Sequence, residues 1–226
     1  MSWAAVEGTD LRVADYRVPG LPCRSAAVSL NDGTELVFSP GAALLDAFVE
    51  EGREASVLVT CNSYHHMGLA KWKARFPDAT VCAGRGALAR LAKKGQRCVA
   101  DIASIQDRLP AGVSIIEVPS TRIGEVWLRS ETDEGVSWVV GDSFFNMRAA
   151  RRLGPRTLQR VAKSGPGLSM SHLMKWGGLS DRAAFRRWFL AQLDADRPRV
   201  LVPMHGEICA SEEICGELRR LVDRRL

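Results

Sequence analysis

The sequence of 226 residues lacks the features that define several classes of protein. No apolar run approaches the roughly 18 residues that a membrane-spanning helix needs, so we expect no membrane partner. The first residues contain no basic segment followed by an apolar one, and we therefore expect no signal peptide. The six cysteines form no Cys-x-x-Cys pair. Scattered cysteines favour reduced, buried thiols, and this pattern predicts a cytoplasmic protein.

Basic residues slightly outnumber acidic ones, and the formal net charge is +5. Basic residues gather between Arg148 and Lys163 and again between Arg219 and Arg225. One interpretation is an anionic substrate or nucleic acid. The other is solvated helix faces, with bases near the end of a last helix favoured by its dipole. No aromatic residues alternate with these bases as they do in single-strand binders, so we do not expect a nucleic-acid partner.

The composition is that of an ordinary globular protein, with 46% hydrophobic and 25% charged residues. Its length suffices for one sizeable domain with a real core, residues 1–226. Asp32-Gly33 lies between two β-rich runs and predicts a hairpin. A second hairpin is expected around 133–135. The expected strands are 11–18, 26–30, 35–39, 56–60, 80–83, 113–118, 125–129, 136–140 and 199–203.

Helical spacing of apolar residues alternates with these strands along the chain. Ser180 is positioned to cap the helix over 181–193, and the Gly- and Ser-rich stretch 164–178 is typical of a long loop. The expected helices are 42–51, 67–76, 86–94, 156–163, 181–193 and 211–226. This order of elements suits a layered α/β protein with two mostly mixed sheets.

Polar side chains follow three of the expected strands at the point where each strand ends. His65 and His66 follow the strand over 56–60, Asp142 follows 136–140, and His205 follows 199–203. Imidazole and carboxylate groups are the donors that zinc, iron and manganese accept. Each residue also has a structural interpretation: the histidines as hydrogen-bonded residues and Asp142 as a turn acid.

The turn that contains His65 and His66 also has an interpretation that requires no metal ion. Asn62 and Ser63 can cap the following helix, and the two histidines can bond to those caps.

The segment Thr60-Cys61-Asn62-Ser63-Tyr64-His65-His66 resembles the Thr-His-x-His-x-Asp-His motif of the metallo-β-lactamase superfamily. Further segments resemble that family in the same order along nearly the whole chain. They are Ser39-Pro40-Gly41, Thr121-Arg122-Ile123-Gly124, Val139-Val140-Gly141-Asp142 and Val202-Pro203-Met204-His205-Gly206. The resemblance implies a four-layer αββα sandwich of two mixed β-sheets. The segment Trp72-Lys73-Ala74-Arg75-Phe76-Pro77 also resembles an uncharacterised branch of the family, in which a His-His pair follows an asparagine.

The departures from the family pattern limit what the resemblance implies. Cys61, Ser63 and Thr121 stand where the family's first metal has histidine ligands, and serine and threonine are poor ligands for that chemistry. The second site corresponds to His65, His66, Asp142 and His205. The resemblance therefore implies one divalent metal in that site, with zinc the first candidate and iron or manganese the alternatives, or no metal at all. Four protein ligands would fill a tetrahedral ion.

Two functions follow from these positions. The first is a mononuclear metal-dependent hydrolase of an ester, thioester, lactone or phosphoester, in which Asp142 acts as general base if it is not a full ligand. The second is a catalytically inactive binding or scaffold protein that keeps the fold without metal. In either case we expect a small-molecule substrate or ligand. The net positive charge of the protein is compatible with an anionic one. The sequence leaves a homo-oligomer open.

Overall fold

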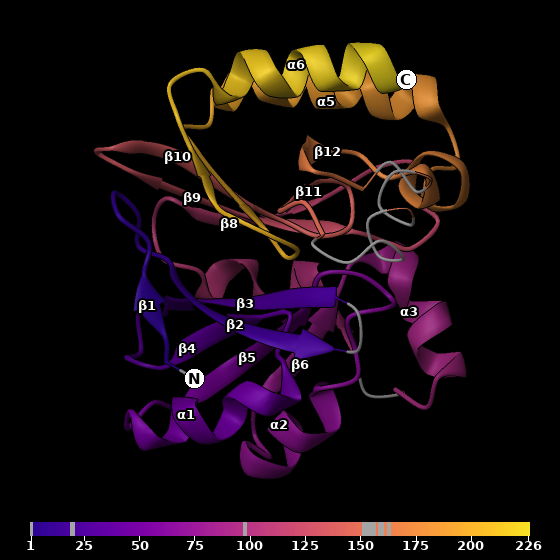
Figure 1. The fold of residues 1–226 in the computed structure, drawn as a ribbon. Coiled ribbons are helices and arrows are strands. Elements are labelled where there is room, and N and C mark those ends of the chain that lie inside the picture. Colours follow the sequence, from indigo (N-terminus) through magenta and orange to yellow (C-terminus); the bar gives the residue numbers. More distant parts are fainter. Residues whose placement is uncertain (1, 19–20, 97–98, 151–156, 158–160, 162–163) are drawn as a thin grey trace.

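The computed structural model describes every residue except 1, 19–20, 97–98, 151–156, 158–160 and 162–163. Two β-sheets face each other, and helices cover the outer face of each sheet (Figure 1). The chain therefore has the four-layer αββα architecture that the resemblance implies. No helix in the described part of the chain is both long and apolar enough to cross a membrane.

The first sheet has seven strands in the order β1-β2-β3-β4-β5-β6-β7 and is antiparallel at its beginning and parallel from β4 onward. The expected hairpin at Asp32-Gly33 joins β3 to β4, and Gly33 has the positive φ that this turn requires. The strands are β1 (Ala4–Ala5), β2 (Arg12–Val18), β3 (Leu21–Ser29), β4 (Glu35–Phe38), β5 (Ala55–Thr60), β6 (Thr80–Ala83) and β7 (Ala100–Asp101).

The helices α1 and α2 cover the outer face of this sheet and lie below it in Figure 1, whereas Ile102 and Ile105 of the 3-10 segment after β7 pack into the core between the sheets. The expected helix over 42–51 divides into a 3-10 turn and an α-helix, and an unexpected 3-10 segment follows β7. The helices are η1 (Ala42–Leu44), α1 (Leu45–Glu50), α2 (Leu69–Arg75), α3 (Arg85–Lys93) and η2 (Ile102–Arg108).

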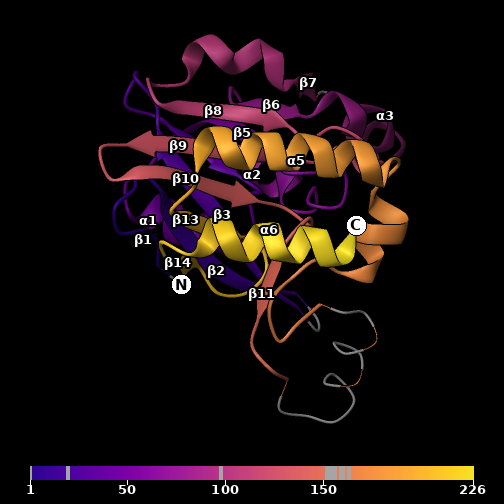
Figure 2. The same ribbon diagram turned by 90° about the horizontal axis from the view of Figure 1, so that it is seen from above.

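The second sheet has five strands in the order β14-β13-β10-β9-β8. Two helices, α5 and α6, lie across its outer face (Figure 2). The strands are β8 (Val113–Glu117), β9 (Val126–Thr132), β10 (Gly135–Val140), β13 (Val200–Pro203) and β14 (Cys209–Ala210). The helices are α5 (Arg182–Asp196) and α6 (Ile214–Arg225).

The alternation of side chains along each strand divides the core into layers. Val57 and Val59 of β5 pack between the two sheets, whereas Leu58 points to the outer layer beneath α1 and α2. In β9, Leu128 points between the sheets and Trp127 points toward α5 and α6. Continuous apolar strands are therefore buried on both faces, which fixes their register and holds the two sheets together.

Two sequence expectations about local structure differ from the described residues, and a third is not tested by them. The stretch 164–178 is not one long loop, because it contains β12 (Gly167–Ser169), which pairs with β11 (Phe145–Met147), and the helical turn η3 (Leu173–Gly178). The cap of α5 is Asp181, whose side chain accepts a hydrogen bond from the backbone N–H of Ala184 (2.9 Å), and not Ser180. Most of the helix expected over 156–163, and most of the bases in that region, lie outside the described residues.

Candidate metal centre

His65, Asp142 and His205 meet at one rim of the sandwich, and one ligand atom of each lies within 4.8 Å of the others. His65 lies in the turn between β5 and α2, on the side of the first sheet. Asp142 and His205 closely follow β10 and β13, which run parallel with Val140 opposite Pro203. Because parallel neighbours end at the same edge of a sheet, these two residues are brought together by the register alone.

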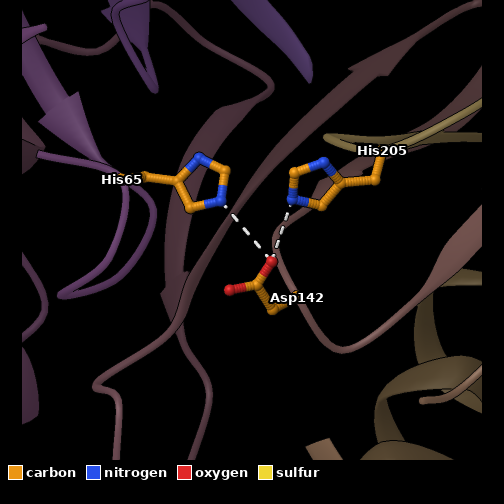
Figure 3. Close-up of side chains that lie close together, drawn as sticks. All are labelled: His65, Asp142 and His205. Carbon is orange, nitrogen blue, oxygen red and sulfur yellow. Dashed lines mark hydrogen bonds and ion pairs between the residues drawn. The ribbon is translucent and has the colours of Figure 1, made fainter. Parts of the chain in front are cut away.

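The two imidazole rings point their Nε2 atoms at the same carboxylate oxygen (Figure 3). Asp142 Oδ1 lies 3.1 Å from His205 Nε2 and 3.4 Å from His65 Nε2. The ring centroids of the histidines are 5.2 Å apart. Two nitrogen donors and one oxygen donor therefore converge on one small volume.

The opposite nitrogen of each ring is held by a fixed partner. His65 Nδ1 lies 2.7 Å from Ser39 Oγ, and His205 Nδ1 donates to the carbonyl of Pro22 at 2.9 Å. A carbonyl can only accept, so Nδ1 of His205 carries a proton. In a neutral ring Nε2 would then present its lone pair to the Asp142 carboxylate, which is unfavourable. Either the ring is protonated twice or a cation lies between the two groups.

The donor set and its surroundings are compatible with a metal site. Metal-binding histidines commonly have the second ring nitrogen hydrogen-bonded to a carbonyl or another oxygen, which fixes the tautomer and the ring orientation. Both histidines of this group have such a partner. The residues therefore fit the single metal that the resemblance implies.

Electrostatics without a metal favour an ion pair. Burial disfavours charge on His205, but its hydrogen bond to Asp142, further hydrogen bonds and the carboxylate charge outweigh this and raise its pKa to about 10. Burial likewise opposes ionisation of Asp142, and the nearby histidines outweigh it and hold the pKa of this carboxyl well below its usual range. The carboxylate thus stays ionised and available as a ligand.

The structure does not bring His66 into this group. Its Nδ1 is buried without a hydrogen-bond partner among the described residues. Burial, with smaller effects from Lys94 and His65, lowers its pKa. The ammonium group of Lys94 donates to the carbonyl of Ser63, close to this turn, at 2.7 Å. The gathered set therefore contains three of the four residues expected from the sequence.

Asn62 is a site residue whose role the sequence did not reveal. Its side-chain Nδ2 donates to Asp142 Oδ2 at 3.0 Å, and its Oδ1 accepts from the backbone N–H of Tyr64 at 2.8 Å. The expectation that Asn62 and Ser63 cap the next helix is wrong, because the N-cap of α2 is Gly68 and no side chain bonds there. Asn62 instead ties the turn that carries His65 to the carboxylate of the other sheet.

The positions that the resemblance assigns to a first metal, Cys61, Ser63 and Thr121, form no such donor set in the described part of the chain. Cys61 is completely buried, and burial, with additional effects from Asp142 and Glu125, raises the pKa of its thiol well above the usual value. Thr121 donates to the carbonyl of Val118 at 3.0 Å and accepts from the N–H of Glu125. Cys61 is therefore a neutral thiol, and the Thr121 hydroxyl serves to close the turn before β9.

Two cavities open onto the group and share Leu21, Tyr64, Asp142 and His205 among their lining residues. One has a volume of about 360 Å³ and reaches toward Tyr16 and Cys23. The other has a volume of about 510 Å³ and is lined mainly by apolar side chains. Both volumes lie in the range of small-molecule sites, roughly 300–1,000 Å³.

Comparison with known proteins bears on the fold. No protein-family model matches the sequence, and a search of curated proteins found no match. Solved structures are similar over nearly the whole chain. The DIM-1 metallo-β-lactamase has a TM-score of 0.60 at 11% identity, over 98% of this chain and 96% of its own. The mono-zinc form of FIM-1 from Pseudomonas aeruginosa has a TM-score of 0.62 at 10% identity, over 99% and 96%.

A further similar structure is the metal-soaked flavodiiron core of Flv1 from Synechocystis. Its TM-score is 0.62 at 14% identity, and the match covers 99% of this chain and 60% of that one. The chain therefore has the metallo-β-lactamase fold, as the motifs indicated. At these identities the similarity establishes the fold alone.

Proposed function

We propose that this protein is a hydrolase that binds one divalent metal ion through His65, Asp142 and His205 and cleaves an ester, thioester, lactone or phosphoester. The observation that carries the proposal is that the Nε2 atoms of His65 and His205 converge on Asp142 Oδ1. The Nδ1 atom of each ring is at the same time hydrogen-bonded to a fixed oxygen of the protein. Zinc is the first candidate for the ion, with iron or manganese as alternatives.

The number of protein ligands supports a catalytic rather than a structural ion. Four protein ligands would fill a tetrahedral site, whereas three leave a position for water. When bound, the ion would supply a water of lowered pKa. The similar FIM-1 structure is a mono-zinc form, which is consistent with one ion on this fold.

The protein's own residues orient the reacting groups. Ser39 and Pro22 fix the two rings, and Asn62 holds Asp142 Oδ2 so that Oδ1 faces the histidines. Asp142 is ionised and accepts at both oxygens, so it can serve as a ligand, and it would act as general base only where it is not a full ligand. The adjoining cavities provide the volume for a substrate beside this carboxylate.

A second candidate function is a metal-free binding or scaffold protein. Direct contact between His205 Nε2 and Asp142 Oδ1 at 3.1 Å supports it, because a protonated His205 satisfies the carboxylate without any ion. The cavities would then bind a small ligand without cleaving it. For both candidates a cytoplasmic location remains a sequence prediction, as does the absence of a nucleic-acid partner.

Metal content separates the two candidates. The protein is purified without chelator or added metal and analysed by inductively coupled plasma mass spectrometry beside three variants. The proposal requires about one ion per chain in the parent, its loss in His65→Ala and in His205→Ala, and its retention in His66→Ala. His66 is the matched control because it adjoins His65 but lies outside the group. A parent without metal that also fails to bind added zinc would refute the metal site.

A further inference from the structure

Three exposed large hydrophobic side chains line the two cavities that open onto the site. They belong to a set of five such residues in the described part of the chain: Tyr64, Met67, Val161, Leu173 and Trp176. Tyr64 lines both cavities, Met67 lines the smaller one, and Leu173 lines the larger one. Single exposed apolar residues need no explanation, but a group of them around a cavity marks a binding surface.

The larger cavity is an apolar cleft, and three of the segments that line it supply most of its large apolar side chains. Phe145 and Met147 lie two residues apart on β11 and therefore face the same side of that strand. Leu173 and Met174 begin the helical turn η3, and Ile123 comes from the turn before β9. Unbranched methionine side chains adapt to ligands of irregular shape. The only charged or titratable groups at pH 7 among the described lining residues are Asp142 and His205.

The apolar cleft is continuous with the candidate metal centre. The ring of Phe145 stacks on the ring of His205, with centroids 5.1 Å apart and planes 11° from parallel. Asp142 and His205 line the cleft at this end. Leu173, at the other wall, is 78% exposed. A ligand in the cleft would therefore meet the charged groups at one end and mainly apolar side chains elsewhere, beside Ser164 and Ser171.

From this polarity we infer that the substrate is a fatty-acyl ester or thioester, whose acyl chain lies in the cleft of Ile123, Phe145, Met147, Leu173 and Met174 with its carbonyl at the His65–Asp142–His205 group. The inference rests on the proposed hydrolase function. In the reaction the oxygen of a water molecule bonds to the acyl carbon, and the bond from that carbon to the ester oxygen or thioester sulfur breaks. One proton of the water passes to the departing alcohol or thiol.

The test measures binding, so that it does not depend on turnover. Straight-chain carboxylates from acetate to dodecanoate, each below its micelle concentration, are titrated calorimetrically into the protein with and without added zinc. The affinity is expected to rise roughly fourfold for each added methylene until the cleft is full. Equal affinity for acetate and decanoate would overturn the inference.

Two exposed positions supply matched variants. Leu173→Asp places a charge in the apolar cleft and is expected to weaken decanoate binding at least about tenfold, while acetate binding is unchanged. Met67→Asp changes a residue of similar exposure that lines only the smaller cavity, and it is expected to keep the chain-length dependence. The reverse result is that Met67→Asp loses the chain-length dependence and Leu173→Asp keeps it. That result would place the acyl chain in the smaller cavity and refute the inference.

The outcomes separate this inference from the proposed function. A rise with chain length both with and without zinc, in a protein that binds zinc at the group, supports both. No rise in a zinc-binding protein refutes the acyl chain and leaves the metal centre standing. A rise in a protein that binds no zinc keeps the cleft as an acyl-binding site but refutes the substrate assignment. Sedimentation is run in parallel, because a dimer abolished by Leu173→Asp, without carboxylate binding, would show that a second copy covers the cleft.

Discussion

Asn62 and Asp142, 80 residues apart in the chain, are joined by a hydrogen bond of 3.0 Å from Nδ2 to Oδ2. Asn62 belongs to the turn after β5 in one sheet, and Asp142 follows β10 in the other. The same asparagine accepts from the N–H of Tyr64, so its amide group has a fixed orientation. The carboxylate is therefore oriented by the turn that carries His65.

Replacing Asn62 is expected to weaken the metal site more than the fold. In Asn62→Ala the carboxylate of Asp142 loses its fixed rotamer, and loss of such a partner typically lowers metal affinity by about 10–100-fold. The free energy of unfolding should fall by about 1 kcal/mol, because a half-buried carboxylate loses one of its donors. Competition with a zinc-sensitive dye and urea unfolding measure the two effects. Asn31→Ala, in an exposed turn, serves as control, and unchanged zinc affinity in Asn62→Ala would contradict the positioning role.

Ser39 combines a strained backbone with a hydrogen bond to the site. Its φ of 56° is in the left-handed region that non-glycine residues avoid, and its Oγ lies 2.7 Å from His65 Nδ1. Both Ser39→Ala and Ser39→Gly are expected to weaken metal binding, because each removes the partner of His65. The free energy of unfolding of Ser39→Gly should exceed that of Ser39→Ala by about 1 kcal/mol, since only glycine relieves the strain. Urea unfolding measures the difference. Equal stability of the two variants would show that the strain is absent.

The metal-free protein should lose stability in alkali through His205. The folded-state pKa of this histidine is raised to about 10 by its partners against the effect of burial. Its contribution to stability is therefore complete below the unfolded pKa of about 6.5 and is lost as the pH rises through about 10. Urea midpoints in chelator across pH 6–11 measure it. Other buried groups also titrate in alkali, so His205→Gln is the reference, and parallel profiles for parent and variant would exclude the ion pair.

The opposite sign applies to Asp142, whose pKa is lowered by the histidines against the effect of burial. Its contribution is present above the unfolded pKa of about 3.9 and is lost as the pH falls below that value. We expect Asp142→Asn to remove most of the acid-induced drop in the urea midpoint between about pH 5 and pH 2. A drop of the same size in the variant would show that other carboxyls cause it.

Gly68 is expected to tolerate no side chain. A Cβ at this position would collide with the backbone carbonyl of Pro40, which cannot move without displacing Ser39. Gly68→Ala should therefore destabilise the protein by at least about 1–3 kcal/mol and weaken metal binding as well. Gly177→Ala is the control, because a Cβ there would meet nothing within 4 Å. Denaturant unfolding of both variants measures the difference, and equal stability would refute the close approach.

The fold was predictable from local signals because most of its elements carry their own patterns. Asp32-Gly33 marks a hairpin, and the buried runs of β5, β10 and β13 are strongly apolar. The strands β11 and β12 were missed since each has three residues and depends on its partner for stability. Asp181 was passed over for Ser180 as the cap of α5, because the two neighbouring residues are equally good caps by type.

The site was predictable only in part. Strand ends indicated His65, Asp142 and His205 as candidates, and the structure brings these three together. The sequence could not separate His65 from His66, since adjacent residues of the same type carry the same local signal. It also could not reveal the partners Ser39, Pro22 and Asn62, because each acts through a contact between distant segments.

The donors of the candidate centre come from both halves of the sandwich. His65 stands on the turn of the first sheet, His205 on the second, and the carbonyl that holds His205 belongs to β3 of the first sheet again. A chain with every strand formed but the two sheets slightly separated would have no centre. A bound metal ion would thus link the two sheets, and release of the ion on heating would report the separation of the sheets before the strands themselves unfold.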